Sequence, residues 1–251
     1  GMLPHIQAEF AERHGKVKGG ALAVVALGKL GGREMLPGSD LDLILIYDHA
    51  AGTEMSEGKA KRGHPAPRPL PVSQYFTRLA HQVIAGITAP GPGGKLYEVD
   101  MRLRPSGSKG PVAVSLSGFQ RYHAEDAWTW ERMALTRARV VAGPPARKRK
   151  VEGAIRPALL RPDAAEKAIP DAVAMRARML RDLPPDGPWD VKLGRGGLIE
   201  VEFVAQTLQL VAAKRHPEVL AATTRVALAR LAGAGLLDAA EAETLIAAEH
   251  L

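Results

Sequence analysis

The sequence contains no cysteine. Disulfide bonds and metal sites built on thiolate ligands are therefore excluded, and oxygen or histidine ligands would have to hold any metal. Aromatic residues make up only 4% of the chain, whereas hydrophobic residues as a whole make up 46%. The core must therefore be largely aliphatic. The longest apolar runs fall far short of the roughly 20 residues that a membrane helix needs, so no association with a membrane is expected.

No signal-peptide pattern opens the chain, which together with the absence of cysteine is typical of a cytoplasmic protein. Lysine and arginine number 34 against 27 aspartates and glutamates, a formal net charge of +7. This excess favours an anionic partner, such as a nucleotide or an acidic protein surface. Nucleic acid is an unlikely partner, because no aromatic and basic groove pattern or recognition helix stands out.

The first half of the chain predicts a small sheet with helices. Residues 21–27 are uninterruptedly apolar, as in a central strand buried on both faces. A glycine-rich connection leads to a second apolar strand at 41–47, and the Gly-, Pro- and Lys-rich residues 48–71 predict an exposed loop. Helical patterns cover residues 6–14, 73–88 with Ser73 as its cap, 116–126 and 127–141, where Trp128 and Trp130 are interpreted as packing residues.

The second half predicts helices almost throughout, at residues 164–182, 198–214, 217–233 and 238–251. Gly143, two prolines and a basic run mark a domain boundary. The sequence therefore predicts an α+β chain with a catalytic domain at 1–143, a linker at 144–163 and an all-helical domain at 164–251. Because the last helical pattern has no stop signal, we expect that domain to be truncated at its C-terminal end.

The stretch richest in chemistry begins with Gly38 and Ser39 and continues into two aspartates, Asp40 and Asp42, before the apolar strand. Residues i and i+2 of a strand project from the same face, so the two carboxylates can bind hard divalent cations together. The glycine permits a close backbone approach to phosphate oxygens, to which amide and serine hydroxyl groups can donate. Taken alone, this pattern also occurs in many ordinary turns.

Two carboxylates hold a divalent cation poorly, so a third acid is expected on a neighbouring strand. Residues 96–103 alternate between apolar and charged side chains and predict a strand with Asp100, Arg102 and Arg104 on its charged face. Asp100 is the best candidate for the third ligand, and the arginines would supply fixed positive charge toward phosphates. Two Mg²⁺ ions could then support an in-line displacement. A ladder of surface ion pairs is the alternative interpretation.

Other catalytic constellations are missing from the sequence. The eight histidines are scattered without metal-ligand spacing. Residues 28–32 are rich in glycine and contain Lys29, but they lack the Gly-Lys-Ser/Thr ending of a Walker phosphate loop. No Ser/His/Asp hydrolase signature is present. These absences leave the aspartates as the main candidates for chemistry.

Several of these stretches together resemble the glutamine synthetase adenylyltransferase/deadenylylase family, and the resemblance covers nearly the whole chain. They read GKLGGRE at 28–34, GSDLDL at 38–43, YEVDMRLRPSG at 97–107, WTWE at 128–131 and VVAG at 140–143. The resemblance implies a DNA polymerase beta-like nucleotidyltransferase fold. Full-length members of the family carry two such catalytic halves, of which this chain would hold one.

The resemblance further implies that ATP, with Mg²⁺ or Mn²⁺, donates AMP to a tyrosine hydroxyl of glutamine synthetase. This lowers the activity of glutamine synthetase when nitrogen is plentiful, and pyrophosphate is released. Carried over by position, Asp40, Asp42 and Asp100 become the metal ligands, and Arg102 and Arg104 become electrostatic contributors. Gly38 and Ser39 become the phosphate turn, and Lys29 becomes a further nucleotide-binding residue. A PII signalling protein would act through the full-length enzyme.

Three functional alternatives remain open from the sequence. The stretches at 97–107 and 127–131 favour the adenylylating half, whereas VKLGRGG at 191–197 resembles the half that removes AMP by phosphorolysis as well. A non-catalytic module that binds a nucleotide is the third alternative. Glu200 and Glu202 follow that stretch, where they could bridge toward the catalytic domain or simply form the polar start of a helix.

Overall fold

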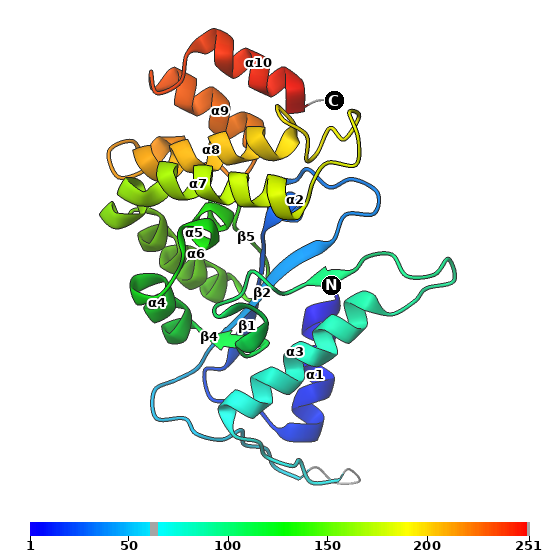
Figure 1. The fold of residues 1–251 in the computed structure, drawn as a ribbon. Helices are drawn as coiled ribbons and strands as arrows, with labels where there is room; N and C mark the ends of the chain where they lie inside the picture. The colour runs from blue at the N-terminus through cyan, green and yellow to red at the C-terminus, as the bar shows by residue number, and fades with distance from the viewer. Residues whose placement is uncertain (61–64, 250–251) are drawn as a thin grey trace. The chain divides into compact units, whose positions relative to one another are not determined.

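A computed structural model of the chain describes residues 1–60 and 65–249 (Figure 1). Residues 61–64 of the predicted loop and residues 250–251 of the last predicted helix lie outside the described residues. The chain divides into two compact units. The first unit contains Gly1–Leu30, Met35–Glu125 and Arg139–Ala154, and the second contains Gly31–Glu34, Asp126–Ala138 and Ile155–Leu251.

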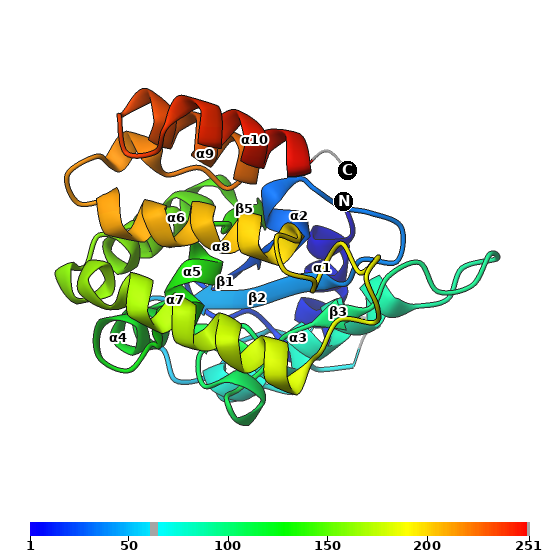
Figure 2. The ribbon, with the colours of Figure 1, turned by 45° about the horizontal axis from the view of Figure 1, so that its top comes forward.

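The first unit is built on a mixed sheet, which confirms an α+β architecture. Strand β1 (Ala21–Ala26) pairs antiparallel with β2 (Leu41–Asp48) on one side and with β5 (Arg139–Ala142) on the other. Strand β2 also pairs in parallel with β3 (Val99–Asp100) and β4 (Ala113–Ser115), as Figure 2 shows for β3. The predicted pair of core strands joined by a glycine-rich connection is confirmed.

One face of the sheet is covered by two helices that lie side by side, α1 (Met2–His14) and α3 (Val72–Thr88) (Figure 1). Aromatic rings concentrate in this layer: Tyr47 of β2 stacks on Phe76 of α3 with ring centroids 4.3 Å apart. The short helix α4 (Leu116–Glu125) lies where the sequence predicted it and contacts β2. Phe10, Tyr47, Tyr75 and Phe76 therefore form an aromatic cluster where these two helices meet the sheet.

The segment between β2 and α3 was predicted to be an exposed loop, but Ser56 and Leu70 within it are buried. Ser56 is buried, because its hydroxyl donates to the carbonyl of His14 at 2.6 Å and accepts from the Leu70 amide at 2.9 Å. The predicted cap of α3 is wrong: the helix begins at Val72, and Ser73 makes no capping hydrogen bond. The Val72 amide instead donates to the carbonyl of Glu54 in the preceding loop at 2.9 Å, so the start of α3 is tied to that loop and not to a serine cap.

The predicted strand at 96–103 is mostly wrong, because only Val99–Asp100 pair with β2. Leu96 is 76% exposed, and after Met101 the chain turns toward the short helix η1 (Gly107–Lys109). The alternation nevertheless identified the packed face correctly, since Tyr97, Val99 and Met101 pack against the core.

The single helix predicted at 127–141 is also wrong. The segment forms α5 (Thr129–Leu135) and then β5. Its end contains two β-branched valines, which favour a strand, and it pairs with β1. The predicted linker contains a helix, α6 (Pro145–Leu159). Within α6, Arg147 of the basic run is buried and bonds to Asp48 at the end of β2, whereas Lys150 of the same run is exposed.

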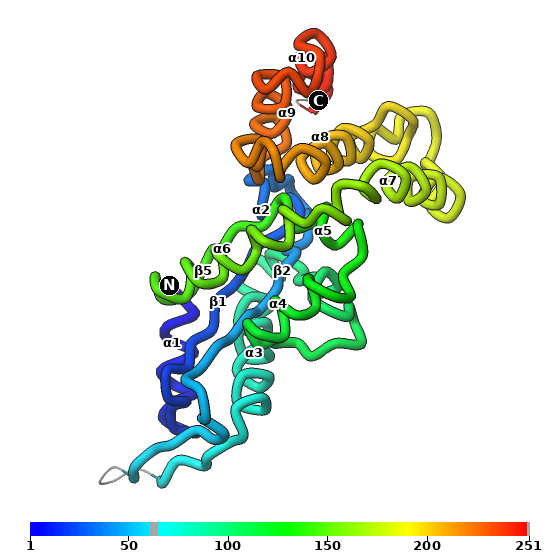
Figure 3. The backbone as a smooth tube through the Cα atoms, turned by 90° about the vertical axis from the view of Figure 1, so that its left-hand side faces the viewer, coloured from blue at the N-terminus to red at the C-terminus, as the bar shows by residue number. Residues whose placement is uncertain are grey.

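The second unit is helical, as predicted for this part of the chain (Figure 3). Its helices α8, α9 and α10 share a small core around Val201 and Leu228. The predicted helix at 217–233 is split, because buried Gln209 accepts a hydrogen bond from the Ala221 amide at 2.7 Å. Besides α5 and the end of α6, its elements include α7 (Pro162–Asp182), α8 (Leu198–Ala212), η2 (Pro217–Val219), α9 (Thr224–Gly233) and α10 (Ala239–Glu249).

In the part of the chain that the structure describes, no helix combines the length and the apolar character needed to span a bilayer.

Candidate functional site

Two of the three predicted aspartates lie next to each other across a pair of strands. In the parallel pairing of β2 with β3, Leu41 lies opposite Val99 and Asp42 lies opposite Asp100. Asp40 immediately precedes β2, whose first residue is Leu41, so it lies just outside the strand on which it was predicted. Neighbouring strands are about 4.8 Å apart, which brings the three carboxylates into one region of the first unit.

Asp100 is held by Arg102, two residues further along the chain. The arginine donates from its backbone amide to Oδ1 at 2.7 Å, and from Nε and Nη2 to Oδ2 at 2.8 and 2.5 Å. The side chain of Asp100 is 13% exposed, whereas that of Arg102 is 79% exposed. The aspartate is therefore fixed by the sheet, and its cationic partner lies in solvent.

The electrostatics of this group tie Arg102 to all three acids. The pKa of Asp100 is lowered chiefly by the side-chain hydrogen bond from Arg102, and burial opposes this effect. The pKa of Arg102 is raised first by the hydrogen bond and the charge of Asp100, and then by the charges of Asp42 and Asp40. One solvent-exposed cation thus pairs with Asp100 and feels the charges of Asp42 and of Asp40, which lies just before β2.

The fit of these residues to a divalent cation is partial. Oxygen donors of this kind suit Mg²⁺ and Mn²⁺. Among residues 1–60 and 65–249, however, no group of three or more histidine and acidic side chains is arranged so that it could hold a metal ion. Both oxygens of Asp100 accept from Arg102 instead. A metal would have to displace this guanidinium, and its exposure leaves room for that movement.

The predicted phosphate turn is a tight reversal with a defined geometry. The Ser39 amide donates to the Leu36 carbonyl at 3.0 Å across Pro37 and Gly38, and Gly38 has φ +78°. Proline followed by a residue of positive φ is typical of a type II turn, which requires glycine at this position. The Ser39 hydroxyl accepts from the Leu36 amide at 3.1 Å, so its own proton is left for another acceptor.

Lys29 lies in a short helix, α2 (Gly28–Gly32), that begins beside the aspartates. A Cβ on Gly28, where φ is +51°, would stand 2.1 Å from Oδ2 of Asp42, closer than any side chain can approach. Glycine is therefore required at this position both by the backbone conformation and by the neighbouring carboxylate. The start of α2 lies directly against one of the predicted metal ligands.

Arg104 takes a different part from the one that its sequence position suggested. Its side chain is largely buried, and it donates to the carbonyls of Met101 at 2.7 Å, Ser108 at 3.2 Å, and Gly110 and Pro111 at 3.2 to 3.3 Å. Burial lowers the pKa of this guanidinium. Arg104 therefore fixes the loop that follows Asp100, and its donors are directed at backbone carbonyls.

Comparison with known proteins adds to this geometry. The profile of the glutamate-ammonia ligase adenylyltransferase family matches residues 3–154, more than half of the chain and the stretch that contains all the predicted site residues. The chain belongs to the glutamate-ammonia ligase adenylyltransferase family. Residues 174–251 match the profile of a second family, PII-uridylyltransferase.

Individual relatives support membership in the adenylyltransferase family. A protein of Brucella suis is 48% identical over 81% of this chain, and one of Rhodopseudomonas palustris is 43% identical over 98% of it. Both are named bifunctional glutamine synthetase adenylyltransferase/adenylyl-removing enzyme. The aligned stretches cover 20% and 24% of those proteins, so the chain spans less than a quarter of the length of each relative.

The structure of this member of the adenylyltransferase family also contains a polar cluster that sequence reasoning missed. In the second unit, Arg137 is 3% exposed and bonds to Glu34, Thr224 and Glu202. Glu202, which the sequence placed either in a bridge toward the catalytic domain or at the polar start of a helix, lies in the first turns of α8 and pairs with Arg137 of the same unit. The signal for Glu34 was its place at the end of the GKLGGRE stretch, where it is the one acidic residue beside Lys29 and Arg33.

Two further outcomes concern residues outside the aspartate site. Trp128 is 69% exposed and Trp130 is 37% exposed, so the interpretation of Trp128 as a packing residue is wrong.

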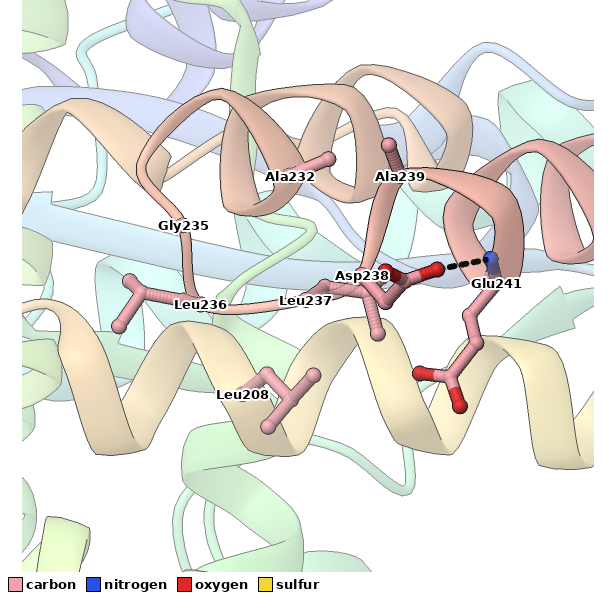
Figure 4. A pocket seen from close by; sticks show the side chains of 8 residues that line it. All are labelled: Leu208, Ala232, Gly235, Leu236, Leu237, Asp238, Ala239 and Glu241. Carbon is pink, nitrogen blue, oxygen red and sulfur yellow. Dashed lines mark hydrogen bonds between the residues drawn. The ribbon is translucent and has the colours of Figure 1, made fainter.

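Figure 4 shows a pocket in the second unit, where Asp238 caps α10 by accepting from the amides of Ala240 and Glu241. The pocket is otherwise lined mainly by leucine, alanine and glycine, and it contains none of the predicted site residues.

Proposed function

We propose that this chain catalyses nucleotidyl transfer, moving AMP from ATP to a tyrosine hydroxyl of glutamine synthetase. The observation that carries the proposal is the register of Asp42 with Asp100, with Asp40 beside them and one exposed arginine facing all three. Membership in the adenylyltransferase family and the names of the relatives support the choice of donor and acceptor. A DNA polymerase beta-like nucleotidyltransferase fold is part of the same proposal.

Asp40, Asp42 and Asp100 would hold the divalent cations, Mg²⁺ or Mn²⁺. When bound, two such ions stabilise both the attacking and the leaving oxygen of an in-line displacement. Without a metal, the single charge of Arg102 pairs with Asp100 and offsets only part of the negative charge of the three acids. When it leaves Asp100, the exposed Arg102 side chain can reach the phosphates of ATP, to which guanidinium groups bind in a bidentate manner.

Other residues of the first unit would place the triphosphate. The proton of the Ser39 hydroxyl and the backbone at Gly38 are directed to a phosphate oxygen, and Lys29 supplies a charge from α2. Arg104 acts as a positioning residue, since its donors hold the loop after Asp100. The tyrosine oxygen then attacks the α-phosphorus, the bond to the bridging oxygen of pyrophosphate breaks, and the phenolic proton leaves to solvent.

The adenylylating direction is our first choice, and removal of AMP by phosphorolysis is the alternative. Both activities appear in the names of the relatives. The stretches at 97–107 and 127–131 favour adenylylation, whereas residues 191–197 also resemble the half that removes AMP. A PII signalling protein is proposed as a partner only through the longer protein. A module that binds ATP without turning it over is the remaining alternative.

The test is incubation of the chain with unmodified glutamine synthetase, Mg²⁺ and ATP labelled at the α-phosphate. We expect label on glutamine synthetase, and none when the label is on the γ-phosphate or when both Asp40 and Asp42 are replaced by asparagine. Phosphate-dependent release of ADP from adenylylated glutamine synthetase would instead identify the removing direction. ATP binding that survives loss of all three aspartates, without turnover by the unchanged chain, would identify a non-catalytic module.

A further inference from the structure

The loop that follows Asp100 in the first unit is held from its inner side by a buried arginine. Arg104 is 7% exposed. It donates five hydrogen bonds to four backbone carbonyls, those of Met101 at 2.7 Å, Ser108 at 3.2 Å, Gly110 at 3.2 and 3.3 Å, and Pro111 at 3.2 Å. Burying a charged group is costly unless hydrogen bonds replace those to water. The first unit therefore uses a buried cation to fix the shape of one surface loop.

This arrangement ties up the acceptors of the loop and leaves its donors on the outside. The carbonyls of Ser108 and Gly110 accept from the buried guanidinium, and those of Ser106 and Gly107 accept from the amides of Lys109 and Gly110 at 3.2 Å. The side chains of Ser106, Ser108 and Lys109 are exposed. Within residues 1–60 and 65–249, neither serine hydroxyl takes part in a hydrogen bond, and the lysine makes no ion pair. The outer surface thus offers two hydroxyl donors and a positive charge.

The backbone at Ser106 is strained. Its φ of 62° and ψ of 17° lie in the left-handed region, which glycine adopts easily and a residue with a side chain does not. Its side chain forms no cap that would compensate for this conformation. Strained residues of this kind concentrate at functional sites, where a contact with a ligand gives them a role. We therefore looked for what the serine hydroxyl could contact.

The tip of the loop folds back onto Arg102, whose side chain pairs with Asp100. A Cβ on Gly107 would stand 3.6 Å from the Arg102 carbonyl oxygen, so the two backbones lie close together. A Cβ on Gly110 would stand 2.2 Å from the Pro105 carbonyl oxygen, so the loop closes too tightly there for any side chain. The exposed donors of the loop are thus held beside the arginine that pairs with a predicted metal ligand.

We propose that Ser106, Ser108 and Lys109 form a subsite for the β- and γ-phosphates of ATP, the groups that leave as pyrophosphate. This inference rests on the proposed function. In that reaction the tyrosine oxygen attacks the α-phosphorus at the aspartates, and the bridging oxygen keeps the electron pair of the bond that breaks. Negative charge therefore grows on the leaving pyrophosphate. Donors that are already fixed in place stabilise such charge without reorganisation, and hydrogen bonds to charged groups are the stronger ones.

The experiment compares Ser106→Gly and Lys109→Met with a matched control, Lys18→Met. Lys18 is also an exposed lysine of the first unit, but it precedes β1 at the end that pairs with Asp48 and not at the end that pairs beside Asp42. Isothermal titration calorimetry in the presence of Mg²⁺ measures the dissociation constants of pyrophosphate, inorganic phosphate and AMP for each full chain. Urea unfolding measures the stability of the same variants.

We expect Ser106→Gly and Lys109→Met each to weaken pyrophosphate binding by about tenfold, the scale of one hydrogen bond to a charged group. AMP binding should not change, since AMP lacks the β- and γ-phosphates, and Lys18→Met should bind all three compounds as the unchanged chain does. Ser106→Gly should not lower the unfolding midpoint, because glycine relieves the strained backbone.

Two results would overturn the inference. If the loop serves only as a turn, both loop variants will bind pyrophosphate as tightly as the unchanged chain, whatever happens to their stability. If only the binding of inorganic phosphate weakens, the loop serves the free phosphate of the removing direction and not ATP.

Failure of the proposed function gives a different outcome. If the unsubstituted chain transfers no AMP to glutamine synthetase, yet its pyrophosphate binding depends on Ser106 and Lys109, the proposed function fails and the anion subsite stands. If the chain transfers AMP and the two loop variants bind pyrophosphate normally, the proposed function stands and this inference fails.

Discussion

Two arginines of this protein each face several acidic side chains, yet they do so in opposite surroundings. Arg102 in the first unit is 79% exposed and faces Asp100, with Asp42 and Asp40 nearby. Arg137 in the second unit is 3% exposed and contacts Glu34 and Glu202. The number of charges alone therefore does not distinguish the two groups.

Solvent access decides what each group can do. An exposed ion pair is worth little to stability because water and salt compete with it, so Arg102 can leave its acids at small cost. A buried arginine that loses its partner leaves an uncompensated charge, so separating Arg137 from its acids would destabilise the fold. We infer that the first group is built for exchange, with a cation or phosphate taking over one side of the pair, and that the second is built for fixation.

The largest effect should come from removing an acid of the exposed group. Asp42→Asn should lower AMP transfer by more than about 10²-fold, because the loss of a metal ligand should exceed the 10- to 100-fold effects known for outer-shell partners. The control is Asp48→Asn at the far end of the same strand, where the acid pairs with Arg147 and Lys150. AMP transfer is measured as labelled AMP on glutamine synthetase. An equal loss of transfer in Asp42→Asn and Asp48→Asn would show that Asp42 has no special part in the reaction.

The second prediction contrasts the two arginines directly. Arg137→Met should lower the free energy of unfolding by about 3 kcal/mol, since it removes a buried guanidinium that pairs with the partly exposed Glu34 and Glu202. Arg102→Met should cost no more than about 1 kcal/mol. Urea unfolding of both variants measures the difference. If the two costs are alike, solvent access is not what separates the groups.

The third prediction concerns two glycines of positive φ. Gly38→Ala should cost about 1 kcal/mol from backbone strain alone, because no atom lies within 4 Å of the position that its Cβ would take. Gly28→Ala adds a collision with Asp42 to the same strain. We therefore expect Gly28→Ala to lose more stability than Gly38→Ala. Urea unfolding curves of the two variants test this order.

The smallest effect is a dependence of stability on pH. The pKa of Asp100 is lowered in the folded state, mainly by Arg102, so its contribution is fully present above the unfolded value of about 3.9. It is lost as the pH falls from there through the folded value. Asp100→Asn should therefore flatten the dependence of the unfolding midpoint on pH below about 4 and leave it unchanged from pH 5 to 8. A difference confined to neutral pH would contradict this assignment.

The parts of the fold that follow from local pattern were predictable. An unbroken apolar run predicted β1, and period-3.6 patterns predicted α3, α4, α7 and α8, because each pattern reflects which faces are buried. The pairing of Asp42 with Asp100 could be anticipated because the chemistry demands a third acid beside two others. The strand register supports that expectation.

What could not be predicted depends on contacts between distant segments. The segment at 127–141 has helical spacing throughout, and only its pairing with β1 turns its end into a strand. The alternating pattern at 96–103 placed Arg104 on the charged face and so predicted a catalytic charge. Its actual partners are backbone carbonyls of the turn that follows, and carbonyl positions cannot be read from the sequence. Glu34 and Arg137 are 103 residues apart. No local pattern links a lone glutamate to a lone arginine over that distance.

If Arg102 takes the place of a divalent cation among Asp40, Asp42 and Asp100, the affinity of the chain for Mn²⁺ should depend on these residues. The dissociation constant of Mn²⁺ is measured by electron paramagnetic resonance for the unchanged chain, Asp42→Asn, Asp48→Asn and Arg102→Gln. We predict weaker binding by at least about tenfold in Asp42→Asn, no change in Asp48→Asn, and tighter binding in Arg102→Gln. Equal affinity in Asp42→Asn and Asp48→Asn would contradict the claim.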